Sequence, residues 1–136
     1  MNEYVKQAQD FLKACNATMR IRKLGCSQNT DWNDKFWRNV YIATIETPID
    51  TMIVRFWDSA YNTEQGIEPT EYDILSCLQK YDVGTIDDFV SDFGYEVHKW
   101  SDVKKIQRMY NAVVKEYNDI CRCFSPEQIE LLRDIT

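Results

Sequence analysis

The residue that most often performs acid–base chemistry occurs once in this sequence, as His98 in the stretch Glu96–Trp100. Catalysis by a histidine needs an orienting group, with a nucleophile or a metal close by. The sequence offers no such arrangement, no glycine-rich phosphate loop and no hydrolase motif. We therefore expect a protein that is not an enzyme and that holds no cofactor. An enzyme that uses dispersed carboxylates is a hypothesis left open.

Cysteines are the second set with chemical potential. Their number is odd, no CxxC pair occurs, and their spacing does not match that of a zinc knuckle. The five are Cys15, Cys26, Cys77, Cys121 and Cys123. We expect no metal site and reduced thiols, with Cys77 and Cys121 in the core, because an unpaired cysteine behaves as a small hydrophobic residue.

The distribution of charge is the strongest functional indication. The 136 residues carry a formal charge of −6, with 22 acids and 16 bases. Residues 58–102 alone hold 11 acids and 2 bases, whereas the flanking segments are slightly basic. A uniformly basic nucleic-acid-binding protein is therefore excluded. The densest acidic cluster consists of Asp82, Asp87, Asp88, Asp92 and Glu96.

Three interpretations of this acidic cluster stay open. It could be a solvated surface with acids at helix N-termini, where the helix dipole favours them. It could be a partner-binding surface that imitates nucleic-acid phosphates or pairs with a basic groove, since such complementarity speeds encounter and sets specificity. A divalent-cation site is the weakest interpretation, because residues 82–88 lack the ligand series of an EF-hand.

Two further features could bind a partner. A basic stripe on the longest predicted helix consists of Lys104, Arg108, Lys115 and Arg122. It is a solvated helix face, a nucleic-acid-binding surface, or a surface that neutralises acids on a second copy in a homodimer. Trp32, between two polar residues, is either covered by its own domain or exposed to a partner, since tryptophan is enriched in interface hot spots.

The N-terminal part, residues 1–57, is predicted to form a helix and a sheet. Asn2 can cap a first helix that ends near Asn16. Alternating apolar and polar residues then predict strands over Thr18–Leu24, Phe36–Glu46 and Thr51–Trp57, with a loop over residues 25–34. The short connections favour a three-stranded antiparallel meander.

The C-terminal part has the period of helices. Residues 58–68 form a polar connection, and residues 69–136 predict four helices. Thr70 and Thr85 each begin a capping box, Ser101 caps a long helix over about residues 102–123, and Ser125 with Pro126 begins the last. We expect one α+β domain over residues 1–136.

The run from Glu68 to Tyr95, EPTEYDILSCLQKYDVGTIDDFVSDFGY, resembles a segment that recurs in small acidic proteins of bacteriophages and mobile elements. The likeness continues through Ile106 and the stretch 110–116, and so covers about half of the chain. It implies a genomic setting and a fold, and it carries over no active-site residues. Proteins of this setting include anti-CRISPR proteins, several of which place acidic surfaces in nucleic-acid grooves.

Together these features predict a phage-type, anti-CRISPR-like inhibitor that binds a host nucleic-acid-binding defence protein, with a CRISPR effector complex as the expected class. The alternative is a nucleic-acid-binding regulator that uses the basic stripe. No apolar run approaches the roughly 20 residues that span a bilayer, so we expect a cytoplasmic protein of the host cell without membrane contact.

Overall fold

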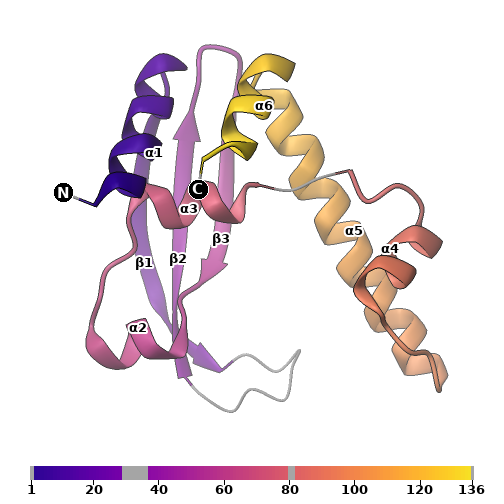
Figure 1. The fold of residues 1–136 in the computed structure, drawn as a ribbon. Coiled ribbons are helices and arrows are strands. Elements are labelled where there is room, and N and C mark those ends of the chain that lie inside the picture. Colours follow the sequence, from indigo (N-terminus) through magenta and orange to yellow (C-terminus); the bar gives the residue numbers. More distant parts are fainter. Residues whose placement is uncertain (1, 29–36, 80–81, 136) are drawn as a thin grey trace.

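The computed structural model describes residues 2–28, 37–79 and 82–135. In these ranges the chain forms six helices and a three-stranded sheet, which confirms the predicted α+β class (Figure 1). The elements are α1 (Glu3–Ala14), β1 (Thr18–Gln28), β2 (Trp37–Glu46), β3 (Thr51–Trp57), α2 (Ala60–Gln65), α3 (Glu71–Cys77), α4 (Ile86–Phe93), α5 (Trp100–Cys123) and α6 (Pro126–Arg133).

The sheet is antiparallel with the order β1-β2-β3, as the meander prediction requires. The loop predicted to begin at Gly25 is wrong, because β1 continues to Gln28. A register shift between Lys23 and Gly25 accommodates one extra residue as a bulge, after which pairing with β2 resumes. The glycine and the polar residues that follow it gave no strand signal in the sequence.

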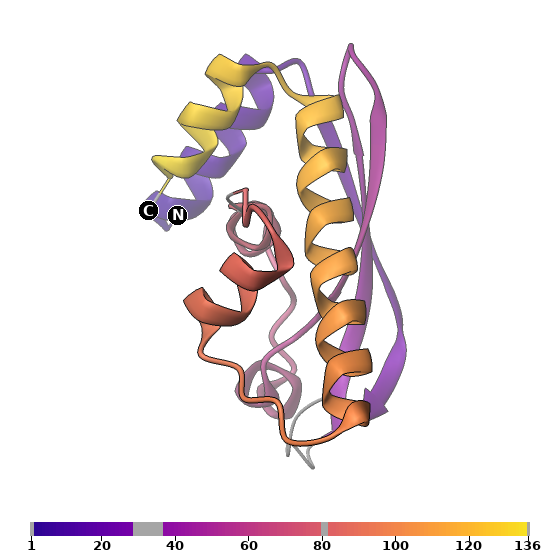
Figure 2. The same cartoon turned by 90° about the vertical axis from the view of Figure 1, so that its right-hand side faces the viewer.

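The helices gather on one face of the sheet and leave the other face bare (Figure 2). Alternation along the strands explains this arrangement, because successive side chains point to opposite faces. On β3, for example, Met52, Val54 and Phe56 are buried, whereas Ile53 and Arg55 are exposed. One sheet face therefore builds the core and the other faces solvent.

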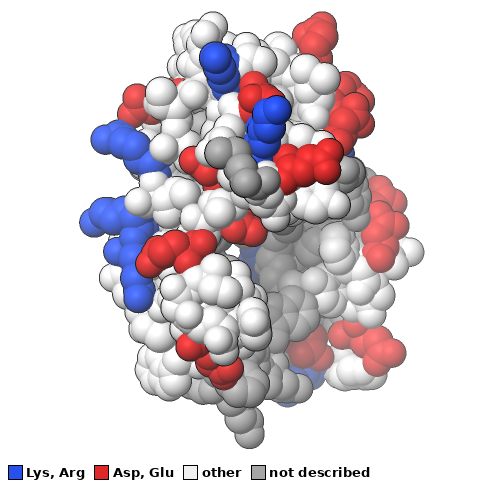
Figure 3. All heavy atoms as spheres, turned by 60° about the vertical axis from the view of Figure 1, so that its left-hand side comes forward, with Lys and Arg blue, Asp and Glu red and all other residues white. Residues whose placement is uncertain are grey.

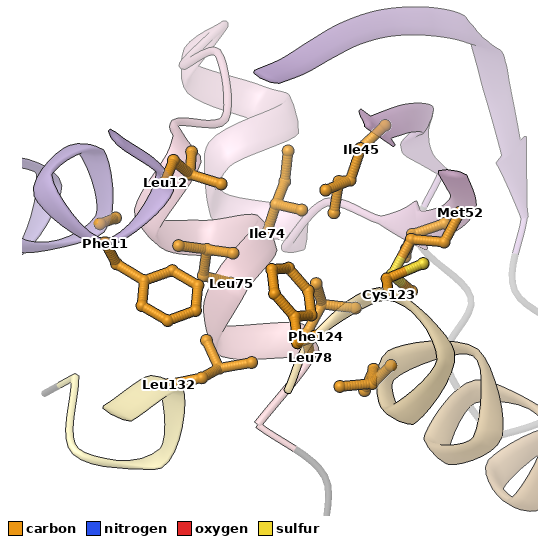
Figure 4. Close-up of a cluster of buried hydrophobic side chains, with 14 of the residues drawn as sticks. Phe11, Leu12, Ile45, Met52, Ile74, Leu75, Leu78, Cys123, Phe124 and Leu132 are labelled. Atoms are coloured by element: carbon orange, nitrogen blue, oxygen red, sulfur yellow. The ribbon is translucent and has the colours of Figure 1, made fainter. Parts of the chain in front are cut away.

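We call the larger buried cluster the main core. Figure 4 shows side chains of α1, the sheet, α3, the end of α5 and α6 meeting there. The rings of Phe11 and Phe124 lie 5.6 Å apart at its centre. Its fully buried large side chains include Tyr41, Ile45, Ile74, Leu75, Ile120, Phe124 and Leu132.

A second, separate buried cluster joins α4 to α5, and we call it the α4–α5 cluster. Val83, Phe89 and Ile106 form its centre, and partly buried apolar residues of both helices pack around them. In Figure 1 α4 and the N-terminal part of α5 lie away from the sheet, while the C-terminal end of α5 reaches the main core. The acidic segment therefore lies on a unit with its own small core.

Three element boundaries differ from those predicted. Within the expected connection 58–68, Ser59 accepts a hydrogen bond from the Asn62 N–H and begins the six-residue helix α2. Helix α5 begins at Trp100 rather than after a Ser101 cap, because the Asp102 carboxylate accepts the backbone N–H groups of His98 and Lys99. Helix α1 ends at Ala14, two residues before the expected end, and Asn16 has a left-handed backbone with φ of 51°.

The prediction that Cys77 and Cys121 lie in the core is wrong, since both are exposed. On α3 the side that faces the core carries Ile74, Leu75 and Leu78, and on α5 Ile120 and Cys123 face the core instead. Cys15 and Cys123 are the buried thiols, and burial raises the pKa of both. The buried thiols are therefore packing residues in the neutral form.

Candidate functional site

Helix α4 is held by caps at both ends. At its start, Thr85 Oγ1 accepts from the Asp88 N–H, and Asp88 Oδ2 accepts from the Thr85 N–H at 3.1 Å. At its end, Gly94 adopts a left-handed backbone with φ of 67°, which a glycine reaches without steric cost. The Tyr110 hydroxyl of α5 donates to the Gly84 carbonyl at 2.6 Å and fixes the entry of the helix.

The outer surface of α4 presents three carboxylates, Asp87, Asp88 and Asp92, which we call the acidic face. All three are exposed, and Ser91 lies exposed among them. Phe89 points the other way into the α4–α5 cluster and is 2% exposed. The helix is thus amphipathic, and its packing into the protein orients the acids toward solvent.

The other two acids of the predicted cluster flank this helix and have local partners. Asp82 Oδ1 accepts the Gly84 N–H at 2.9 Å, and Glu96 Oε2 lies 2.9 Å from His98 Nε2. Asp88 is engaged in the capping box. In the part of the chain that the structure describes, Asp87 and Asp92 make no hydrogen bond or ion pair.

Asp87 and Asp92 differ in their relation to the helix dipole. Asp87 lies in the first turn of α4, where the partial positive charge of the helix stabilises it. Asp92 lies in the last turn, where the partial charge is negative, and no basic residue occupies that turn. Asp92 is therefore the acid that the dipole of α4 destabilises.

Because of this contrast, we expect two matched substitutions to change the free energy of unfolding in opposite directions. Asp87→Asn should lower the free energy of unfolding by about 0.3–1 kcal/mol, and Asp92→Asn should raise it by about the same amount. Urea denaturation at low ionic strength measures both, with the same variants at high salt as the control for screening. Equal effects of the two substitutions would contradict the dipole argument.

The four residues of the basic stripe differ in whether they have ion-pair partners. Arg122 Nε lies 2.6 Å from Asp50 Oδ2, and another Arg122 nitrogen lies 2.6 Å from Asp119 Oδ1. Lys115 Nζ lies 2.8 Å from the second oxygen of Asp119. Arg122 thus links α5 to the β2–β3 turn, and Lys115 pairs within α5. Lys104 and Arg108 are exposed and form no ion pair among the described residues.

The pKa of both acidic partners is lowered. For Asp50 the hydrogen bond from the Thr51 N–H is the main cause, followed by that from Arg122. For Asp119 the main cause is the hydrogen bond from Lys115, again followed by Arg122. Both carboxyls are therefore stabilised in the charged form.

A pH dependence of stability follows from these lowered pKa values. The stabilisation is present above the unfolded aspartate pKa of about 3.9 and is lost as the pH falls through the lower folded values. Arg122→Gln should therefore lower the Tm at pH 7, and the difference from the parent should shrink between about pH 4 and pH 2. Circular-dichroism melts measure this, with Arg133→Gln, which breaks a surface pair with Glu130, as the charge-matched control. A difference that does not change with pH would contradict the role of the pair.

Basic and acidic side chains are unevenly distributed over the part of the surface that Figure 3 shows. In Figure 3, most of the basic side chains lie toward the left-hand edge, and acidic side chains predominate toward the right. The predicted partner residue Trp32 lies outside the described residues. The surface seen in this view is thus unevenly charged despite the modest net charge.

An apolar hollow of about 610 Å³ lies between the end of β3, Gln79 and the α4–α5 pair. Phe93 lies at i, i+4 spacing from Phe89, and this spacing predicts that both rings face inward. That prediction is wrong for Phe93, which lines this hollow and is 49% exposed. The reason is that α4 ends at Phe93 and its ring stacks on Tyr95 at the border of the cluster. Apart from Gln79 and Glu116, the lining is apolar or aromatic.

No family model, curated protein or solved structure matches this chain. Over residues 2–28, 37–79 and 82–135, no group of three or more histidine, cysteine or carboxylate side chains could hold a metal ion. No helix in these ranges is long and apolar enough to cross a membrane.

Proposed function

We propose that the protein is a phage-type inhibitor that binds a host nucleic-acid-binding defence protein, of the CRISPR effector class, and blocks its basic nucleic-acid site. The observation that carries the proposal is the acidic face of α4, in which Asp87 and Asp92 are exposed and unpaired among the described residues. Asp92 also opposes the helix dipole, so its charge is explained better by a partner than by the fold.

The mechanism is occupation of the basic site by a rigid acidic surface. Carboxylates on one capped helix keep fixed spacing, so they pair with cations of the partner without ordering a loop first. Complementary charge steers the encounter and makes the rate of association depend on salt. The sheet and the long helix then exclude nucleic acid by their bulk.

The test uses the double variant Asp87→Asn with Asp92→Asn and leaves Asp88 to cap α4. It should weaken capture of the host partner by at least about tenfold, since each rim charge contributes to association and two are removed. Asp10→Asn with Glu64→Gln is the matched control, because both acids are exposed on other helices and the change in net charge is the same.

Interference assays in a host with an active CRISPR system provide the functional readout. The parent chain and the control variant should suppress interference, and the α4 variant should not. If the α4 variant still inhibits as strongly as the parent while remaining folded, the acidic face is not the inhibitory surface. If the parent chain itself fails to suppress interference and captures no nucleic-acid-binding protein, the proposed class is wrong.

A further inference from the structure

The first turns of α5 carry a tryptophan that the protein leaves uncovered. Trp100 is 71% exposed, the highest value among the large apolar side chains that the structure describes. Val103, Lys104, Gln107 and Arg108 follow it at the spacing of one helix side and line a shallow hollow of about 760 Å³ with it. We call these five residues the Trp100 stripe.

The two cations of the Trp100 stripe are available for a ligand. Lys104 and Arg108 are exposed and form no ion pair within the described ranges, unlike Lys115 and Arg122 further along the same helix. The acid closest to them in sequence, Asp102, is turned toward the backbone N–H groups that precede the helix. The stripe is therefore a locally positive surface beside an exposed indole.

We infer that the Trp100 stripe binds single-stranded nucleic acid, an activity separate from the proposed blocking of a host protein. An exposed indole offers a flat face on which an unpaired base stacks, and such stacking tolerates any base. Lys104 and Arg108 lie one and two turns further along the helix and meet the phosphates that flank the stacked base. The stripe spans about 12 Å along the axis, since each helical residue rises 1.5 Å, which suits a segment of a few nucleotides.

A single strand fits these features better than a duplex. In a duplex the bases stack on one another, and the faces that an indole needs are hidden. Two cations are also few for a duplex-binding protein, whose affinity depends on many phosphate contacts. Tryptophan also anchors protein interfaces, so binding of an acidic protein to the stripe without binding of the single strand would overturn the inference.

The experiment measures fluorescence anisotropy of a labelled twelve-nucleotide oligothymidylate titrated with the full chain at low salt. Binding should weaken with salt along a logarithmic slope of about −1.4, the value for two phosphate contacts on a single strand. Trp100→Ala should lower the affinity by about fivefold or more through the lost stack. Lys104→Gln with Arg108→Gln should lower it similarly and flatten the salt slope.

The charge-matched control is Arg22→Gln with Arg55→Gln, on the bare face of the sheet. Register places both arginines opposite Ile42, and both are exposed. This control should bind as the parent does, within about twofold. Asp87→Asn with Asp92→Asn should bind at least as well as the parent, which separates this activity from the proposed inhibition.

Several outcomes would overturn the inference. Absence of binding by the parent chain at low salt would do so directly. A sheet-face control that loses binding while the Lys104 and Arg108 variant retains it would transfer the site to the sheet. Equal affinity of Trp100→Ala and the parent would show that charge alone attracts the oligothymidylate and that no base stacks on the indole. Stronger binding to a duplex of the same length than to the single strand would exclude the stacking geometry.

Discussion

Replacing Phe124 with alanine should lower the free energy of unfolding by about 3–5 kcal/mol, the range for truncating a fully buried aromatic side chain. Phe124 is 2% exposed and lies between the end of α5 and the start of α6. Its ring meets Phe11 of α1, so the substitution leaves a cavity where three helices converge. Neighbouring groups cannot close such a cavity without moving several elements at once.

Urea denaturation followed by circular dichroism measures this loss as a shift of the midpoint at constant slope. Tyr61→Ala is the control, because this aromatic ring is 65% exposed on α2 and its removal should change stability by less than about 0.5 kcal/mol. A loss below about 1 kcal/mol for Phe124→Ala would mean that the main core repacks around the missing ring. A change in the slope of the free energy of unfolding against urea concentration would instead indicate a change in the unfolded or native ensemble.

Replacing Phe89 with alanine should have a similarly large effect that is confined to the α4–α5 cluster. Phe89 is the central ring of this cluster, with centroids 5.4 Å from Tyr95 and 5.7 Å from Tyr110. The cluster shares no buried residue with the main core. Its loss of about 3–5 kcal/mol should therefore detach α4 while the sheet and the terminal helices stay folded.

Hydrogen exchange resolved by residue tests this separation. Amides of α4 should lose protection in Phe89→Ala, and those of β2 should keep it. Phe93→Ala on the same helix is the matched control, and its smaller burial should give a smaller change. Loss of protection in β2 and α4 together would show that the two clusters unfold as one unit.

Most of the fold was predictable because local signals and tertiary burial agree. The meander follows from alternation on β2 and β3, and the starts of α3, α4 and α6 follow from their capping boxes. The continuation of β1 beyond Gly25 was not predictable, because the bulge depends on pairing with β2. Helix α2 was missed because its six residues are too few to show an apolar periodicity.

The sequence predicted which charged residues form the candidate site but not which of them have hydrogen-bond or ion-pair partners. The sequence indicates where the acids cluster, but only the structure distinguishes Asp88, which caps α4, from Asp92, which has no partner among the described residues. The pairing of Arg122 with Asp50 joins positions 72 residues apart and has no local signal. The exposure of Trp100 was equally hidden, because apolar type alone predicts burial.

The two clusters also differ in how much of the chain must exist before each can form. The α4–α5 cluster draws its members from Val83 to Val114, so its contacts close shorter loops than those of the main core. The main core needs Ala8 at one end and Ile135 at the other, so it waits for α6 to leave the ribosome. Until then the inner face of the sheet is uncovered in a nascent chain, and its apolar side chains are exposed to aggregation.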